Sequence, residues 1–205
     1  GELIETIRRE PKICHYIDMP IQHASDSVLR RMGRRTTRAE LLERIGSIRE
    51  QIPDICLRTT LISGFPGETQ EDHEQLKAFV EECRFDRLGV FAYSEEEGTP
   101  AAAMDGQIPQ EIKEERRDEI MELQQDIAFE KCESMVGRVL DVMIEGRVEQ
   151  ENAYAGRTYM DAPDVDGMIF VQTGEELMTG DFVRVRVTGA LEYDLIGEIE
   201  DEFTE

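Results

Sequence analysis

A chain of 205 residues with a net charge of −23 is too acidic to take a nucleic acid as its main partner, because phosphate binding relies on Lys and Arg displacing counterions. Its 40% hydrophobic content supports one sizeable core and a second small one, and excludes a disordered chain. No apolar run reaches the roughly twenty residues that span a bilayer, and the first residues lack the regions of a signal peptide, so we expect a cytoplasmic protein with no membrane partner.

The first part of the chain alternates between apolar strands and amphipathic helices. Residues 13–21 have the pattern of a strand, and Ser25 or Ser27 is placed to cap a short helix after it. Thr37 stands three residues before Glu40, which is capping-box spacing, and opens a helix with apolar residues on one face, Leu41, Ile45, Ile48 and Ile52. We therefore expect successive β/α units.

Two more strands continue this pattern. Residues 56–63 are apolar and rich in threonine, as expected of a strand covered on both faces, and residues 88–93 form the next candidate. Thr69 begins the helix between them, and a long helix over residues 109–132 follows. Three β/α units do not close a barrel. We expect a partial, TIM-like α/β barrel that is either truncated or was covered at its first edge by an upstream part.

Past residue 134 the pattern changes to short strands separated by Gly, Asp and Pro turns. Val183, Val185 and Val187 alternate with arginines, which is the period of a strand with one wet face. We therefore place a first domain at residues 1–134 and a small, all-β, five-stranded OB-like barrel at residues 135–205. The five candidate strands of this barrel are residues 139–144, 154–159, 168–172, 182–187 and 191–199.

Polar residues follow each strand of the first domain. In chain order they are Gln22, His23 and Ser25; Gly64, Pro66, Gly67 and Glu68; and Tyr93 with Glu95, Glu96 and Glu97. Because the carboxyl ends of parallel strands meet at one rim, we expect these residues to form half of an enzyme site. Taken singly, the histidine is more often structural and a Gly-Pro turn is usually only a turn, and no GxxxxGK[ST] phosphate loop is present. The prediction rests on three segments in the right order.

The four cysteines are spread too far apart to bind a metal together. Cys14, Cys56, Cys83 and Cys132 form no CxxC or CxxxCxxC pattern, the spacings that hold zinc or an iron–sulfur cluster. His15 beside Cys14 does not change this, because neighbours on a strand point to opposite faces. We expect buried or half-buried reduced thiols and no metal ligands in this chain.

Several longer segments carry a family resemblance. They are Tyr-Ile-Asp-Met-Pro-Ile-Gln-His-Ala-Ser (16–25), Arg-Arg-Met-Gly-Arg-Arg (30–35), Arg58 with Gly-Phe-Pro-Gly-Glu-Thr (64–69), and Tyr-Ser-Glu-Glu-Glu-Gly-Thr-Pro (93–100). Together they resemble the later half of a radical S-adenosylmethionine (SAM) methylthiotransferase. The barrel, with Gly-Arg-Thr (156–158) and Asp-Ala-Pro-Asp-Val-Asp-Gly (161–167), is similar to the TRAM domain of that family. The resemblance covers nearly the whole chain and implies that residues 1–134 are the carboxyl-terminal half of a radical SAM barrel.

Two features favour the RimO type over the tRNA-modifying members of the family. Those members usually carry Gln-Ser where this chain has Gln22-His23, and their TRAM domain is basic. From residue 135 onward this chain has 17 Asp and Glu against five Arg and no Lys, a net charge of −12. The resemblance implies an aspartate β-carbon in small-subunit ribosomal protein S-twelve as the substrate, and an acidic TRAM domain would attract that basic protein.

The resemblance also implies SAM and two four-iron four-sulfur clusters as cofactors of the intact parent protein. One cluster cleaves SAM reductively, the resulting deoxyadenosyl radical takes hydrogen from the aspartate, and the auxiliary cluster takes part in sulfur delivery. By position in the family, eight residues surround SAM: Gln22, His23 and Ser25 near the ribose or methionine, Ile62 and Gly64 along the adenine, and Arg58, Glu68 and Tyr93 lining the same cavity.

The cysteine motifs of the family have no counterpart in these 205 residues. Both the CxxxCxxC loop that binds the radical cluster and the three cysteines of the amino-terminal domain are missing. We therefore predict that this polypeptide alone holds no cluster and is inactive. Two other readings stay open: a tRNA-adenosine methylthiotransferase of the same family, and a non-catalytic acidic module that binds a basic protein.

Overall fold

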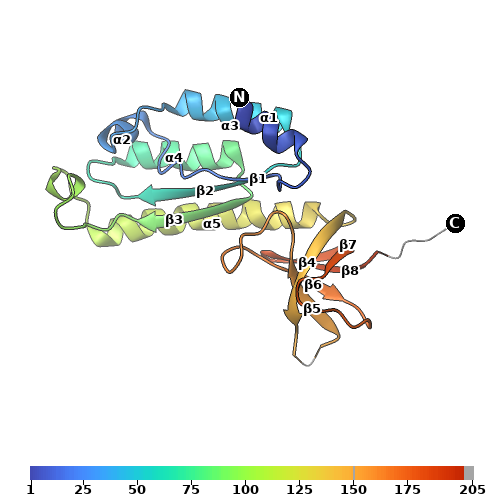
Figure 1. Ribbon diagram of the computed structural model, residues 1–205. Helices are drawn as coiled ribbons and strands as arrows, with labels where there is room; N and C mark the ends of the chain where they lie inside the picture. Colours follow the sequence, from blue (N-terminus) through green and yellow to red (C-terminus); the bar gives the residue numbers. More distant parts are fainter. Residues whose placement is uncertain (150, 201–205) are drawn as a thin grey trace. The chain divides into compact units, whose positions relative to one another are not determined.

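A computed structural model describes residues 1–149 and 151–200 of the chain. The chain divides into two compact units, Gly1–Ile127 and Ala128–Glu205 (Figure 1). The helix α5 (Gln110–Ser134) belongs partly to each unit, so the expected division after residue 134 stays a prediction. None of the helices in the described ranges is both long enough and apolar enough to cross a membrane. With 25 residues α5 has the length, but it is rich in charged residues.

Three parallel strands form the sheet of the first unit, in the order β1-β2-β3. The expected strand at residues 56–63 is confirmed at both ends, whereas the first strand is shorter than the expected 13–21. It ends before Pro20, which has no N–H to donate to a neighbouring strand. Pairing resumes only as a single bridge between Gln22 and Leu61. The strands are β1 (Tyr16–Asp18), β2 (Cys56–Ser63) and β3 (Arg87–Ala92).

The helices of the first unit begin where the sequence places their caps. Thr37 and Thr69 each accept a hydrogen bond from the amide three residues further on, in capping boxes, so both expected helix starts are confirmed. The sequence does not predict the first helix, since it lacks a side-chain cap and buries only Ile7. The helices that precede α5 are α1 (Glu2–Arg9), α2 (Asp26–Arg31), α3 (Arg38–Gln51) and α4 (Gln70–Cys83), with a short 3₁₀ turn at Ala101–Ala103.

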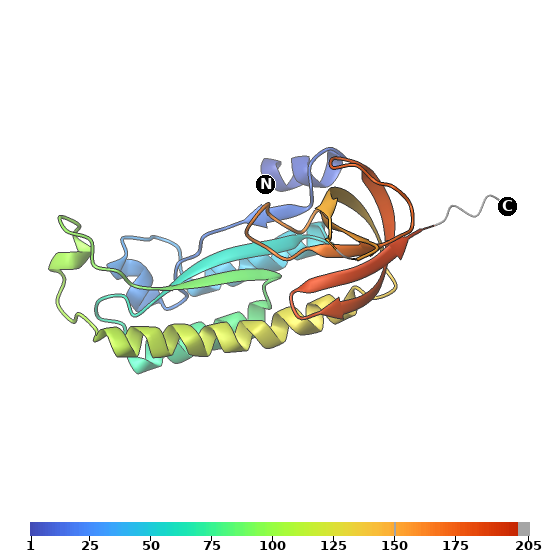
Figure 2. The same cartoon turned by 90° about the horizontal axis from the view of Figure 1, so that it is seen from below.

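The helices cover one face of the sheet. Leu57 and Leu61 of β2 are fully buried and belong to one apolar core with residues of the three longer helices, among them Ile45, Phe79 and Ile120. In Figure 2 the part of α5 that belongs to this unit runs along the strands. Burial of this apolar surface holds the three β/α units together.

The opposite face of the sheet is only partly covered. Arg58, Thr60 and Ile62 of β2 point to this side and are half-buried, and Phe91 of β3, which pairs with Ile62, is 64% exposed. We call these four residues the open face. The expectation that β2 is covered on both faces is therefore only partly correct, since the helices of the core pack against the other face and this one is half-buried.

The second unit is a closed five-stranded barrel, as expected, with strand order β4-β5-β6-β8-β7. Val185 and Val187 are buried and Val183 is half-buried, while Arg184 and Arg186 between them are exposed, so the period-two prediction is confirmed. The apolar interior also takes in the residues around the end of α5. The strands are β4 (Val139–Arg147), β5 (Ala153–Arg157), β6 (Ile169–Gln172), β7 (Phe182–Leu191) and β8 (Asp194–Ile199).

Candidate functional site

The carboxyl ends of the three parallel strands bring the polar segments to one edge of the sheet. Residues 19–25, 64–69 and 93–109 follow β1, β2 and β3, and we call them the rim segments. The amide of Ile62 donates to the carbonyl of Gln22 at 2.7 Å, which ties the first segment to β2. This segment starts beside Arg58, which pairs with Asp18 at the end of β1, and reaches the edge at Gln22, which bridges Leu61. The three segments recognised in the sequence therefore meet at the same edge.

Glu68 is the centre of a buried network at this edge. Its side chain is fully buried, and it accepts hydrogen bonds from the amide of Gly64 at 2.8 Å and from Nη1 of Arg116 at 2.8 Å. Nε2 of His23 lies 3.3 Å from the second carboxylate oxygen. Burial raises the pKa of the Glu68 carboxyl, but His23, the Gly64 amide and Arg116 outweigh it, so the pKa lies below its ordinary value. Glu68 is therefore ionised, and these neighbours compensate its negative charge.

The contacts of His23 fix its tautomer. The backbone amide of Ser25 donates to Nδ1 of His23 at 2.9 Å, so Nδ1 is an acceptor and the ring N–H lies on Nε2, facing Glu68. The ring is completely buried. In this arrangement His23 supports the turn that follows β2.

Ser25 joins α2 to α4. Its hydroxyl and that of Ser27 both donate to Oδ1 of Asp72, at 2.5 Å each, while the amide and hydroxyl of Thr69 donate to Oδ2. Burial raises the pKa of the Asp72 carboxyl, but these four donors outweigh it and bring the pKa to about 2. The hydroxyl of Ser25 is thus engaged with a carboxylate inside the protein.

Tyr93 and Gly64 share a neighbour on α5, Lys113. The ammonium of Lys113 donates to the carbonyl of Tyr93 at 3.1 Å and lies 4.9 Å from the centre of its ring. Gly64 has a φ of +76°, and a Cβ there would come within 2.4 Å of Cγ of Lys113, so only glycine fits. Tyr93 also packs edge-on against Phe65, with ring centres 5.3 Å apart.

The remaining three expected site residues lie apart from this network. Gln22 has a φ of +75°, unusual for a residue with a side chain, and it is half-buried beside the fully buried His23. Ile62 belongs to the open face. Arg58 lies on the same face but near the start of β2, about 16 Å from the strand's end at Ser63, where it pairs with Asp18 at 2.7 Å. The structure therefore brings Arg58 to Asp18, at the start of the first rim segment, and away from the Gly64–Glu68 turn.

Lys113 and Arg116 are the site residues that the sequence pattern misses. The charged run 111–119 has the composition of a solvated helix face, but both basic residues are buried. Their burial could have been predicted from the sequence, because Lys113 and Arg116 continue the buried stripe of α5 at helical spacing. That stripe is Lys113, Arg116, Ile120, Gln124 and Ile127.

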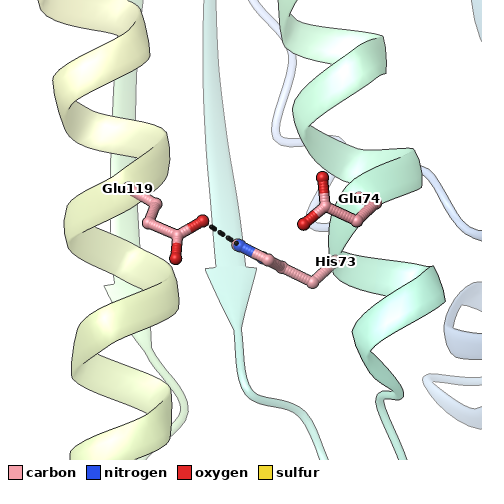
Figure 3. A group of neighbouring side chains, drawn as sticks. All are labelled: His73, Glu74 and Glu119. Atoms are coloured by element: carbon pink, nitrogen blue, oxygen red, sulfur yellow. Dashed lines mark hydrogen bonds and ion pairs between the residues drawn. The ribbon is translucent and has the colours of Figure 1, made fainter.

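A possible metal-binding group lies between α4 and α5. Figure 3 shows His73 and Glu74 on α4 and Glu119 on α5, with Nε2 of the buried His73 3.0 Å from the Glu119 carboxylate. The ammonium of Lys77 already supplies a positive charge to this group, since it lies 2.9 Å from the Glu119 carboxylate and 3.6 Å from the Glu74 carboxylate. Lys77 and His73 lower the pKa of the Glu119 carboxyl. The group is therefore an ion-pair network that connects α4 to α5.

The cysteines do not form a ligand set in the described part of the chain. Cys56, Cys83 and Cys132 are buried, as expected, but Cys14 is exposed, so the expectation is wrong for this residue. It precedes β1 rather than lying within it, so no neighbouring strand covers it. Burial raises the pKa of the Cys83 thiol to about 12, which opposes the thiolate that iron or zinc requires. The described cysteines thus do not fit an iron–sulfur cluster.

Together these contacts describe an edge built for binding rather than for proton transfer. Glu68 is held ionised, and Nε2 of the buried His23 faces its carboxylate, so both side chains are engaged inside the protein. Their contacts shape the Gly64–Glu68 turn, where the backbone comes close to its neighbours.

Comparisons with known proteins agree with this architecture. Residues 1–80 match the Radical SAM superfamily, and residues 136–199 match the TRAM domain. A protein of Lachnoclostridium phytofermentans is 62% identical over 199 residues, which are 97% of this chain and 45% of the relative. Relatives from Desulfitobacterium hafniense and Clostridioides difficile are 50% and 48% identical over 198 residues, each covering 97% of this chain and 44% of the relative. All three are named ribosomal protein uS12 methylthiotransferase RimO. The chain spans less than half the length of these relatives.

Proposed function

Because the chain belongs to the RimO-type radical SAM methylthiotransferases, as the carboxyl-terminal part of their radical SAM domain followed by a TRAM domain, we propose that it is part of an enzyme that adds a methylthio group to the β-carbon of an aspartate in ribosomal protein uS12. The observation that carries this proposal is the 62% identity to a relative of that name over 97% of the chain. That similarity includes both the rim segments and the acidic barrel.

SAM is the cofactor that the rim segments are proposed to hold. When bound beside a reduced iron–sulfur cluster, it supplies the radical chemistry, and the protein supplies orientation. We propose that Gln22 and Ile62 contact it directly, since they are not fully buried. His23, Ser25 and Glu68 are enclosed in internal contacts and would act by fixing the backbone around Gly64. Tyr93 and Lys113 would close the edge beside that glycine.

We propose that both four-iron four-sulfur clusters of the family bind outside this chain. The cysteines described above do not form a ligand set, so no step of the reaction is assigned to them. Arg58 is proposed to stabilise the far end of the open face through Asp18 rather than to touch SAM. The boundary at residues 134 and 135 is proposed as the functional division between the SAM-binding part and the barrel.

The proposed protein partner is recognised by charge. From residue 135 onward the net charge is −12, which would attract a basic ribosomal protein and repel tRNA. Such a reaction takes place where ribosomal proteins are made, so we propose a cytoplasmic location.

A binding comparison tests the choice of substrate. The chain is titrated with fluorescently labelled uS12 and, separately, with labelled tRNA at several salt concentrations. The proposal expects salt-sensitive binding to uS12 and none to tRNA. Tight binding to tRNA without binding to uS12 would overturn it in favour of a tRNA-directed enzyme.

A further inference from the structure

Arg31, the last residue of α2, is bonded to the backbones of two rim segments. Its Nε donates to the carbonyl of Pro66 at 2.8 Å, and its Nη2 donates to the carbonyl of Asp105 at 2.9 Å. Pro66 belongs to the turn after β2, and Asp105 to the connection between β3 and α5. One planar guanidinium thus joins three parts of the chain that are distant in sequence.

Two glycines allow these parts to pack closely. A Cβ at Gly67 would lie 2.6 Å from Cζ of Arg31, so the guanidinium rests directly on the peptide backbone there. The amide of Gly67 donates to the carbonyl of Gly106 at 2.8 Å, and a Cβ at Gly106 would come within 3.2 Å of Gly67. Both glycines have positive φ angles, of +82° and +75°. The contact is therefore specific in shape as well as in hydrogen bonding.

Arg31 differs from several other arginines of this chain in bonding to backbone carbonyls rather than to a carboxylate. Among the residues that the structure describes, no carboxylate pairs with it, although the sequence has 46 acidic residues against 23 basic ones. By contrast, Arg38, Arg58 and Arg116 each pair with an acidic residue. Arg31 instead donates to two carbonyls, a task for which the fork of arginine is suited and the single ammonium of lysine is not.

The other end of α2 is also fixed. Ser25 and Ser27 bond to Asp72 at the start of α4, as described above. The short helix is thus attached at its first turn to one helix start and at its last residue to two rim segments. Movement of the Gly64–Glu68 turn against residues 94–108 would require Arg31 to release a carbonyl.

We propose that Arg31 is a positioning residue, which holds the Gly64–Glu68 turn against residues 94–108 and so sets the shape of the SAM-binding edge. This inference rests on the proposed function for its consequence, but the positioning itself can be measured without any catalysis. The variants are Arg31→Gln, Arg31→Lys and, as a matched control, Arg30→Gln. Arg30 is its neighbour on α2, and its Nε donates only within that helix, to the carbonyl of Asp26.

The first measurement is amide hydrogen exchange at Gly67 in the 205-residue chain. Arg31→Gln is expected to speed hydrogen exchange at the Gly67 amide by about tenfold, because the hydrogen bond from this amide to Gly106 is then no longer held in place. Arg31→Lys is expected to speed exchange nearly as much, because a single ammonium lacks the fixed fork whose two nitrogens reach the two carbonyls. Arg30→Gln should stay within about twofold of the unchanged chain. Equal exchange in Arg31→Gln and Arg30→Gln, or full protection in Arg31→Lys, would overturn the proposal.

The second measurement uses a cluster-loaded enzyme that contains this chain. Arg31→Gln is expected to raise KM for SAM about tenfold while kcat stays within about twofold, because the binding edge is displaced but the reacting groups are not. An unchanged KM together with faster exchange at Gly67 would overturn the claim that Arg31 sets the shape of the SAM-binding edge, although Arg31 would still hold the turn. If the unsubstituted enzyme itself neither binds SAM nor modifies uS12, the proposed function fails, and the exchange measurement still decides whether Arg31 holds the rim.

Discussion

Arg116 of α5 donates to the buried carboxylate of Glu68 across 2.8 Å, and this pair attaches a helix to the turn that follows β2. The carboxylate is fully buried and the Arg116 side chain is 10% exposed, so water screens the pair very little. The contact connects the buried stripe of α5, which packs against the core, to the Gly64–Glu68 turn at the rim.

Replacing Arg116 by Met should leave the Glu68 carboxylate buried without its main cation. We expect a loss of about 3 kcal/mol in the free energy of unfolding, as for other broken buried pairs, measured by urea denaturation. Arg117→Met is the matched control, because the Arg117 side chain is 36% exposed and, among the described residues, forms an ion pair only with Asp118 beside it. This substitution should leave stability nearly unchanged. Equal effects of the two substitutions would contradict the network around Glu68.

The low pKa of Asp72 predicts how the free energy of unfolding depends on pH. Its pKa in the folded protein is about 2, below its ordinary value of 3.8, so its stabilising contribution is complete above that value and is lost as the pH falls towards 2. Asp72→Asn should cost about 1 kcal/mol near neutral pH and much less near pH 2. Denaturant unfolding at both pH values measures this. A cost that does not change with pH would show that the charge of Asp72 is not what stabilises the start of α4.

A comparison of Gly64 with Gly33 separates two reasons why a position requires glycine, a positive φ and a lack of space for a Cβ. Both have a positive φ, of +76° and +74°, but a Cβ at Gly64 would meet Lys113 whereas one at Gly33 would meet open space. Gly33→Ala should therefore cost about 1 kcal/mol from the backbone alone, and Gly64→Ala about 2–3 kcal/mol. Adding Lys113→Ala to Gly64→Ala should leave a smaller loss than the sum of the two single substitutions. Strict additivity would argue against the close contact.

The chain alone should not assemble an iron–sulfur cluster. Anaerobic reconstitution with iron and sulfide is expected to leave no stoichiometric iron after desalting, and no deoxyadenosine should form from SAM. The physical reason is that the described cysteines are dispersed and mostly buried, with the pKa of Cys83 raised to about 12. Stoichiometric cluster together with deoxyadenosine would contradict this.

Local signals in the sequence were sufficient for much of the fold. The β2 strand, the capping boxes at Thr37 and Thr69, and the alternating valines of β7 were all predictable, because each depends on residues close together in the chain. The closed barrel was predictable from the number and spacing of its strands.

The parts that were not predictable depend on partners distant in sequence. Lys113 and Arg116 are polar residues on a buried stripe, and their burial is possible only because Tyr93 and Glu68 lie opposite them. Likewise, the sequence places Glu68 and His23 at the rim but does not show that they contact each other rather than the solvent. The eight residues assigned to SAM by family position remain a prediction. Their internal contacts divide them into half-buried residues that are proposed to touch SAM and buried residues that are proposed to support the edge.

The most direct test of the account is the mass of ribosomal protein uS12 from cells with and without the gene that encodes this chain. The account predicts that uS12 from cells with the gene carries one methylthio group in place of a hydrogen on an aspartate. It also predicts that this group is absent without the gene and returns when the gene is restored. Methylthiolated uS12 in cells lacking the gene, with methylthiolation lost from tRNA instead, would contradict it.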